Sequence, residues 1–180
     1  MQLSNFSDSY IKSVEAGALF HQTHKTWSGK GTLQYKEYLK NLIQRYNIKT
    51  VLDFGCGKGA QYSKFNLDKE LGIEVTQYDP CIHGLESWPI GKWDMVIALD
   101  CLKAIDKKDI DWLYDQFISW ADKCIFIATQ TEFDPKKDKT DLYKDLDRVE
   151  QTLDLVPTNF KKFHNPDFWI MDHFSFIIQP

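Results

Sequence analysis

The chain has 180 residues, 43% of them hydrophobic and 14% aromatic, and a formal net charge of -4 at pH 7. This length is sufficient for one domain whose core needs neither disulfides nor a structural metal. The acidic balance excludes a general attraction to polyanions, and the pairs Lys136-Lys137 and Lys161-Lys162 are too short to form a local basic patch for nucleic acid.

The first 30 residues have no clean hydrophobic period, although they contain Tyr10, His21, His24 and Trp27. We expect residues 1–30 either to form a cap over a ligand cleft or to pack on the sheet edge with solvated histidines. One helical turn would place His21 and His24 on the same face. The opening residues lack the pattern of a secretion signal, and no stretch is long enough to span a membrane, so we expect a cytoplasmic protein that does not contact membranes.

A loop of spaced glycines follows the first predicted strand. Helical spacing predicts a helix over Thr32–Tyr46, and the strand over Lys49–Phe54 then leads to Gly55, Gly57 and Gly59, before a helix that opens at Ala60. Such a loop lets a ligand lie on bare backbone, and its N–H groups and the helix N-terminus are expected to point at a nucleotide. Two classes of cofactor use loops of this kind, dinucleotides and S-adenosylmethionine.

Asp53 separates these two classes. Gly55, Gly57 and Ala60 satisfy the dinucleotide form G-x-G-x-x-A, but Asp53 lies two residues before the first glycine. A pyrophosphate binder needs a loop without a negative charge at that point. The acid and the additional Gly59 therefore favour S-adenosylmethionine.

A second acid ends the next predicted strand. The segment Ile73–Asp79 alternates like a strand, and Asp79 lies 20 residues beyond Gly59. A carboxylate at this place is suited to accept both hydroxyls of a ribose. Pro80 is positioned to pack on the adenine, and Trp88 either flanks the adenine or fills a loop as a buried aromatic residue.

The later elements continue the alternation of strands and helices. Trp93–Asp100 predicts a buried strand whose end brings Leu99 and Asp100 to the cleft, beside the methionine part of the cofactor. The remaining expected elements are a helix over Lys107–Trp120, a strand over Cys124–Thr129, a helix containing Leu142, Leu146, Val149 and Leu153, and two strands at Phe160–Phe163 and Phe174–Ile178 around an Asn165-Pro166-Asp167 turn.

The four cysteines have no C-x-x-C spacing, which argues against a zinc site and fits reduced thiols. Cys56, Cys81 and Cys101 follow predicted strands at the end where a cofactor would lie. We expect them to be pocket-wall residues, and the alternative is a metal site that includes His83.

Four short motifs together resemble the class I S-adenosylmethionine-dependent methyltransferases, particularly small single-domain bacterial and phage members. The motifs are Trp27-Ser28-Gly29-Lys30, Gly57-Lys58-Gly59-Ala60-Gln61-Tyr62, Tyr78-Asp79-Pro80 and Asp100-Cys101-Leu102. The resemblance implies a single α/β domain over residues 1–180. Its Rossmann-like, doubly wound sheet would be mostly parallel with an antiparallel C-terminal strand, in the order 3-2-1-4-5-7-6 with a short third strand.

The resemblance also implies a set of cofactor contacts. They are Trp27, Lys30, Asp53, Gly55, Cys56, Gly57, Gly59, Asp79, Pro80, Trp88, Leu99 and Asp100. Relatives commonly have D-V-L-E-H-I after the fourth strand, whereas this chain has Asp100-Cys101-Leu102-Lys103-Ala104-Ile105. The acid and imidazole of that motif are missing, so a base from this segment is not implied.

Three residues are candidates to assist methyl transfer, namely Asp100, His24 and His173. The reaction needs mainly positioning of an in-line attack and exclusion of water, and an oxygen or nitrogen acceptor also loses a proton. No N-P-P-Y, D-P-P-Y or Pro-Cys segment and no target-recognition domain for base flipping is present. We therefore expect a small-molecule acceptor and a monomer or weak homodimer, with RNA left open.

Two other functions remain as alternatives to an active methyltransferase. One is a catalytically degenerate module that binds S-adenosylmethionine and acts as a partner or regulator. The other is a dinucleotide-dependent oxidoreductase, which Asp53 and the short chain disfavour.

Overall fold

The computed structural model describes residues 5–23, 28–130, 164–170 and 173–179. It contains a six-stranded sheet in the order β2-β1-β3-β4-β6-β5. The strands are β1 (Thr50–Phe54), β2 (Glu74–Tyr78), β3 (Trp93–Leu99), β4 (Ala121–Gln130), β5 (His164–Ile170) and β6 (His173–Gln179). Strands β2, β1, β3 and β4 are parallel neighbours, whereas β6 pairs antiparallel with both β4 and β5.

Five α-helices and three short 3₁₀ segments connect the strands in the described part of the chain. The helices are α1 (Asp8–Thr23), α2 (Lys36–Tyr46), α3 (Ala60–Ser63), α4 (Leu67–Leu71) and α5 (Ile110–Trp120), and the 3₁₀ segments are η2 (Lys30–Tyr35), η3 (Leu102–Ala104) and η4 (Lys107–Asp109). The architecture is an α/β fold with a parallel sheet at its centre.

The expected seven-strand order is wrong, because the short third strand does not form. Between β2 and β3 the chain makes turns, in which the amide of Asp79 donates to Leu85 O and the amide of Leu85 donates to Ile82 O. Pro80 and Pro89 have no N–H group to offer a neighbouring strand. As a result β2 is an edge strand, and its residues alternate between exposed and half-buried until Tyr78.

The position of the turn expected at Asn165-Pro166-Asp167 is also wrong. These residues lie inside β5, which is the outermost strand on its side of the sheet. The pairing of β5 with β6 shifts register between His164 and Asp167. A proline is tolerated there because an edge strand with an irregularity can spare one backbone donor.

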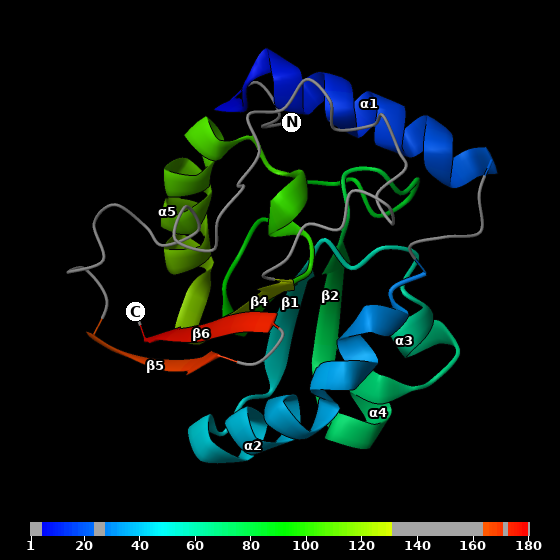
Figure 1. Cartoon of the computed structure of the whole chain (residues 1–180). Helices are drawn as coiled ribbons and strands as arrows, with labels where there is room; N and C mark the ends of the chain where they lie inside the picture. Colours follow the sequence, from blue (N-terminus) through cyan, green and yellow to red (C-terminus); the bar gives the residue numbers. More distant parts are fainter. Residues whose placement is uncertain (1–4, 24–27, 131–163, 171–172, 180) are drawn as a thin grey trace.

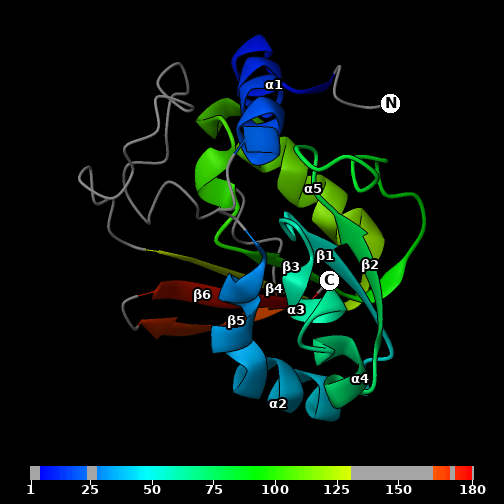
Figure 2. The same cartoon turned by 90° about the vertical axis from the view of Figure 1, so that its right-hand side faces the viewer.

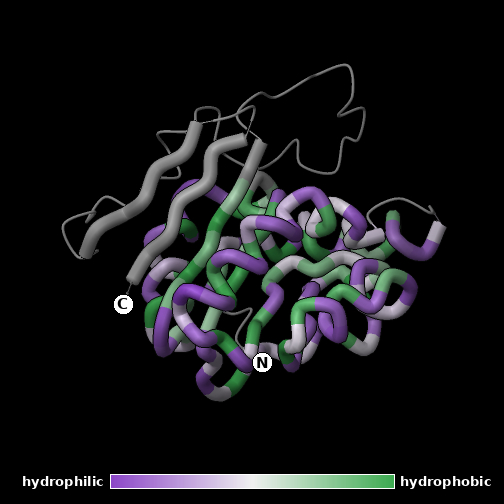
Figure 3. The backbone as a smooth tube through the Cα atoms, turned by 90° about the horizontal axis from the view of Figure 1, so that it is seen from below, coloured by the Kyte–Doolittle hydropathy of each residue, from purple (hydrophilic) through white to green (hydrophobic). Residues whose placement is uncertain are grey.

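Helices cover both faces of the sheet (Figure 2). On one face, Leu113 and Phe117 of α5 pack with Leu52 and Val96, and on the other, Leu39 and Leu42 of α2 pack with sheet residues that include Met95 and Phe126. The central strands are correspondingly apolar along their length, while polar stretches lie in the surrounding helices and loops (Figure 3). Burial on both sides explains why β1 and β3 read as continuous apolar runs.

The N-terminal segment forms helix α1, which lies across the end of the sheet at which the parallel strands finish (Figure 1). Its apolar side is short and contains polar and small residues, because only Tyr10, Ser13, Val14 and Gly17 are buried. A helix of this composition has a weak hydrophobic period, so the period did not reveal it.

Several expectations lie outside the described residues. These are the helix containing Leu142 to Leu153, the strand at Phe160–Phe163, and the positions of His24 and Trp27. Within the residues that are described, none of the helices combines the length and the apolar character that crossing a membrane requires.

Candidate functional site

A cavity of about 220 Å³ lies at the carboxyl ends of the parallel strands, and residues of α1 also line it. Its wall is formed by the glycine loop after β1, the start of the loop after β2, the end of β3 with η3, helix α1 and the start of η2. The lining residues are Tyr10, Ser13, Val14, His21, Gly29, Gly31, Thr32, Phe54, Gly55, Cys56, Gly57, Asp79, Pro80, Cys81, Leu99, Asp100, Cys101, Ala104 and Ile105. In a parallel α/β sheet this edge is where ligands bind.

The backbone amides of the glycine loop are turned inward, contrary to the expectation that they point at a ligand. The amides of Gly55 and Cys56 donate to Tyr78 O at 2.8 and 3.1 Å, and the amide of Gly57 donates to the Asp79 carboxylate. Those of Gly59 and Ala60 donate to backbone carbonyls as well. These five donors are therefore already used, and α3, with four residues, is too short to supply a strong helix dipole.

Asp79 holds the loop after β1 to the loop after β2. Its Oδ2 accepts from the Gly57 amide at 2.8 Å and its Oδ1 accepts from the Cys81 amide at 2.9 Å. Burial raises the pKa of Asp79, and the two backbone donors oppose that rise. A carboxylate offers about four lone-pair positions, so two remain for a ligand in the pocket.

Asp53 lies beneath the glycine loop and outside the set of lining residues. Its Oδ2 accepts from Tyr62 Oη at 2.6 Å and from Gln61 Nε2 at 3.0 Å, so it ties the first turn of α3 to β1. Burial raises the pKa of Asp53 to about 6, against the lowering effect of the two donors. In this structure Asp53 orders the loop through the side chains of Gln61 and Tyr62.

Asp100 turns the chain into the pocket at the end of β3. It adopts a left-handed conformation with φ of 57°, and its amide donates to Ala128 O at 2.7 Å. Its Oδ2 accepts from Gln34 Nε2 at 3.1 Å and from Tyr35 Oη at 3.4 Å. Burial, with the nearby Asp100 charge, raises the pKa of Tyr35, so the phenol stays a donor to the carboxylate.

The structure separates the predicted contacts into two groups. Gly55, Cys56, Gly57, Asp79, Pro80, Leu99 and Asp100 line the pocket, whereas Asp53, Lys30, Gly59 and Trp88 are not among the lining residues. The exposed Lys30 has its Nζ 5.5 Å from the centre of the Phe65 ring, and Gly59 caps α3. The half-buried Trp88 packs among aromatic side chains, stacked on Trp112 at 5.6 Å.

His173, the third catalytic candidate, begins β6, where it pairs with Gln130 of β4. In the described part of the Trp27-Ser28-Gly29-Lys30 motif, Gly29 lines the pocket. Ser28 O accepts from the Ala60 amide at 2.8 Å, and this hydrogen bond joins the segment to the end of the glycine loop.

The lining residues that were not predicted come mainly from α1 and the segments beside it. Tyr10, Val14 and His21 lie four and seven residues apart, so they share one helix face. The signal was present as an aromatic residue and a histidine in the polar N-terminal segment. Which of those residues face the pocket depends on how α1 crosses the sheet.

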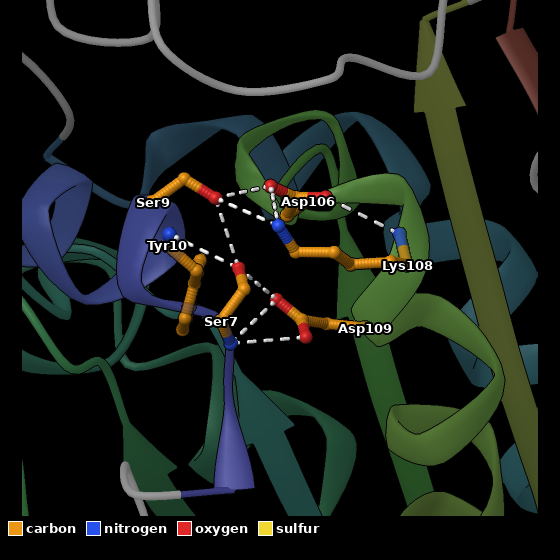
Figure 4. Close-up of polar contacts among 6 residues, drawn as sticks. All are labelled: Ser7, Ser9, Tyr10, Asp106, Lys108 and Asp109. Carbon is orange, nitrogen blue, oxygen red and sulfur yellow. Dashed lines mark hydrogen bonds and ion pairs between the residues drawn. The ribbon is translucent and has the colours of Figure 1, made fainter.

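Two buried carboxylates anchor the start of α1 (Figure 4). The Ser7 amide and hydroxyl donate to Asp109, at 3.1 Å to Oδ1 and 2.8 Å to Oδ2, and the Ser9 hydroxyl donates to Asp106. Ser7 Oγ also accepts from the Tyr10 amide at 3.3 Å, which caps the helix. Asp106 and Asp109 follow η3, so the helix is fastened to the segment that forms one wall of the pocket.

The opposite wall contacts α1 at Gly17. A Cβ atom built on Gly17 would lie only 2.8 Å from Cys81 Sγ, and this thiol is 3.6 Å from Val14 O. The helix therefore rests directly on the loop after β2. Together with the hydrogen bonds to Asp106 and Asp109, this contact fixes α1 to two opposite walls of the pocket.

The three pocket cysteines are wall residues in the thiol form. Burial raises the pKa of Cys56 and of Cys101 well above the ordinary value, and that of Cys81 to about 12. In the described part of the chain, no group of three His, Cys, Asp or Glu side chains is placed to hold a metal ion, and His83 pairs with Glu86.

No protein-family model and no curated protein sequence matches the chain. Solved structures match its fold at low sequence identity. DhpI in a complex with SAM and HEP is 14% identical, with 97% of this chain and 99% of that chain covered and a TM-score of 0.60. The plantazolicin methyltransferase BpumL in complex with SAH is 14% identical over 98% and 93% of the two chains, with a TM-score of 0.57.

A third match is the magnesium protoporphyrin IX methyltransferase of Synechocystis PCC 6803 with bound SAH, which is 16% identical over 83% of this chain and 82% of that chain, with a TM-score of 0.55. Structural matches at such low sequence identity establish a shared fold. The chain therefore has the Rossmann-like fold seen in S-adenosylmethionine-dependent methyltransferases.

Proposed function

We propose that this chain is an S-adenosylmethionine-dependent methyltransferase that acts on a small molecule. The observation that carries the proposal is the inward hydrogen bonding of the loop amides at Gly55, Cys56 and Gly57. A dinucleotide pyrophosphate needs such donors, and here they are already used. S-adenosylmethionine has no phosphate, so it does not need these particular donors. The solved structures of similar fold that contain SAM or SAH support the same cofactor.

The lining residues fit this cofactor by their chemistry. Asp79 keeps lone pairs for the two ribose hydroxyls, and Pro80 beside it offers an apolar surface to the adenine. Gly55 and Gly57 let the amino-acid part approach the backbone. Asp100, whose carboxylate Gln34 and Tyr35 orient, is placed to accept from the ammonium group.

When bound, S-adenosylmethionine supplies an activated methyl group. The residues of the chain position the acceptor in line with that group and exclude water. We propose that residues 1–30, which include α1, act as the cap for this purpose. At about 220 Å³ the cavity lies just below the usual range of ligand sites, roughly 300–1,000 Å³, so an acceptor beside the nucleoside has to be small or extend through the opening.

Isothermal titration tests the cofactor assignment. We expect binding of S-adenosylmethionine and S-adenosylhomocysteine and none of NAD. Release of S-adenosylhomocysteine in the presence of a metabolite extract then distinguishes an enzyme from a module that only binds cofactor. Binding of NAD in place of the other two ligands would contradict the proposal.

The role of Asp79 needs a finer test, because the residue also holds the glycine loop. We expect Asp79→Asn to weaken S-adenosylhomocysteine binding by about 1–3 kcal/mol, through loss of charge-assisted bonds to the ribose. Wild type should bind the 2′-deoxy analogue more weakly than S-adenosylhomocysteine, whereas Asp79→Asn should bind the two ligands with about equal affinity. Glu74→Gln, at the exposed start of β2, the strand that Asp79 follows, is the matched control. If both proteins discriminate equally between the ligands, Asp79 does not contact the ribose.

A further inference from the structure

His21 brings an imidazole to the pocket from α1, opposite the strand ends. The residue lies in the last turn of the helix on the face shared with Tyr10 and Val14, and its Nδ1 is buried from solvent. Ala104 of η3 lines the same cavity with only a methyl group. Helix α1 therefore brings a basic nitrogen to the wall of this cavity.

The surroundings of His21 keep its ring neutral. Burial, and then the positive charge of Lys58 in the glycine loop, lower the pKa of His21 to about 4. At neutral pH the ring is able to accept a proton. The other charged groups that line the cavity are the carboxylates Asp79, which accepts from two loop amides, and Asp100, which accepts from Gln34 and Tyr35.

The remaining titratable side chains of the described lining are poor proton acceptors. Burial raises the pKa of Tyr10 and of the Cys56, Cys81 and Cys101 thiols, so all four keep their protons at neutral pH. Among the lining residues that the structure describes, His21 alone combines a neutral state with a basic nitrogen.

We infer that His21 is the catalytic residue that takes the proton of a small hydroxyl-bearing acceptor, a phenol or an alcohol; this inference rests on the proposed function. In the step, the acceptor oxygen forms a bond to the methyl carbon, the carbon–sulfur bond breaks with its electron pair on sulfur, and the O–H proton passes to the imidazole. The products are a methyl ether, a neutral thioether and an imidazolium, which returns its proton to solvent.

The strength of the base selects the class of acceptor. A hydroxyl proton becomes strongly acidic only as the methyl–oxygen bond forms, so a weak base is sufficient. An alkylammonium has to lose its proton before it can attack, and its pKa is about 10.4. Because the pKa of His21 lies well below that value, His21 is a poor base for this first proton transfer. We therefore expect hydroxyl acceptors to be preferred to alkylamines.

The test compares wild type with His21→Gln and with a double variant, His21→Gln with Gln22→His, which moves the imidazole to the neighbouring exposed position. Titration with S-adenosylhomocysteine comes first, and all three proteins should bind it with the same affinity. Turnover is then measured as S-adenosylhomocysteine release with a panel of phenols, catechol, small alcohols and alkylamines. We expect wild type to use hydroxyl compounds and both variants to lose at least 100-fold in kcat.

Two further measurements distinguish proton transfer from a structural role. A nitrophenol that is already ionised at the assay pH should restore most of the rate of His21→Gln, and the acid limb of the wild-type pH profile should be absent from the variant. NMR of the imidazoles should show a His21 pKa below 6.5 that changes when a hydroxyl acceptor is added to the complex with S-adenosylhomocysteine.

The outcomes separate this inference from the proposed function. If wild type fails to bind S-adenosylhomocysteine, the proposed function is wrong. If it binds but uses only amines or none of the panel, or if His21→Gln turns over neutral phenols like wild type, the assignment of His21 is overturned and the cofactor proposal stands.

Discussion

Because Gly17 lies against Cys81, we expect Gly17→Ala to change the stability of wild type and of Cys81→Ala in opposite directions. Gly17 is in the middle of α1, where alanine is normally preferred to glycine by about 1 kcal/mol. On helix propensity alone, Gly17→Ala should stabilise the protein. The structure predicts otherwise, because the new methyl carbon would lie 2.8 Å from Cys81 Sγ.

The magnitude follows from these two opposing effects. Forcing an extra methyl group into a packed contact costs about 1–3 kcal/mol, so the net change in wild type is a loss of roughly 0–2 kcal/mol. Cys81→Ala removes the sulfur, and the next nearest atom, Cys81 Cβ, lies at an ordinary 3.7 Å. In that background Gly17→Ala should stabilise by about 1 kcal/mol.

Urea denaturation of the four proteins of this double-mutant cycle measures the difference. We expect a coupling of about 1–3 kcal/mol between the two positions, with a change of sign between backgrounds. Equal effects of Gly17→Ala in both backgrounds would refute the close packing of α1 on the loop after β2. The placement of the helix over the pocket would then need to be revised.

Two other variants test the glycine loop and the buried acid beneath it. Gly57→Val should abolish S-adenosylhomocysteine binding, because Gly57 lines the pocket at a φ of 60°. The control is Gly72→Val, at a φ of 67° and with nothing near the new Cβ, which should lower stability without affecting binding. Binding by a folded Gly57→Val protein would show that the loop has been misinterpreted. For Asp53, the folded pKa of about 6 exceeds the ordinary value of 3.8, so the folded state binds its proton more tightly. As pH rises from about 4 to 6, wild type should therefore lose about 3 kcal/mol of stability relative to Asp53→Asn. Urea denaturation of both proteins at matched pH measures this difference. A difference that does not change across this range would contradict the burial of an ionisable acid at this position.

The local signals in the sequence were sufficient for the central part of the fold. The apolar runs of β1 and β3 and the acid at the end of β2 identified the parallel strands, because a strand buried on both faces has few other compositions. The spaced glycines then identified the turn. The positive φ values of Gly55, Gly57 and Gly59 agree with this, since other residues rarely adopt them.

Whatever depends on distant partners was decided only by the tertiary structure. The direction of the loop amides is an example, because it depends on Tyr78 O and Asp79, which reach the loop from the next strand. The helical segment with His21 also lacked a strong period, and its register over the pocket depends on contacts of Ser7 with Asp109, 102 residues away. The sequence by itself determined the strand ends at which a ligand would bind. Only the packing of α1 across those ends decided which side chains complete the pocket, because short-range patterns do not encode which elements meet in space.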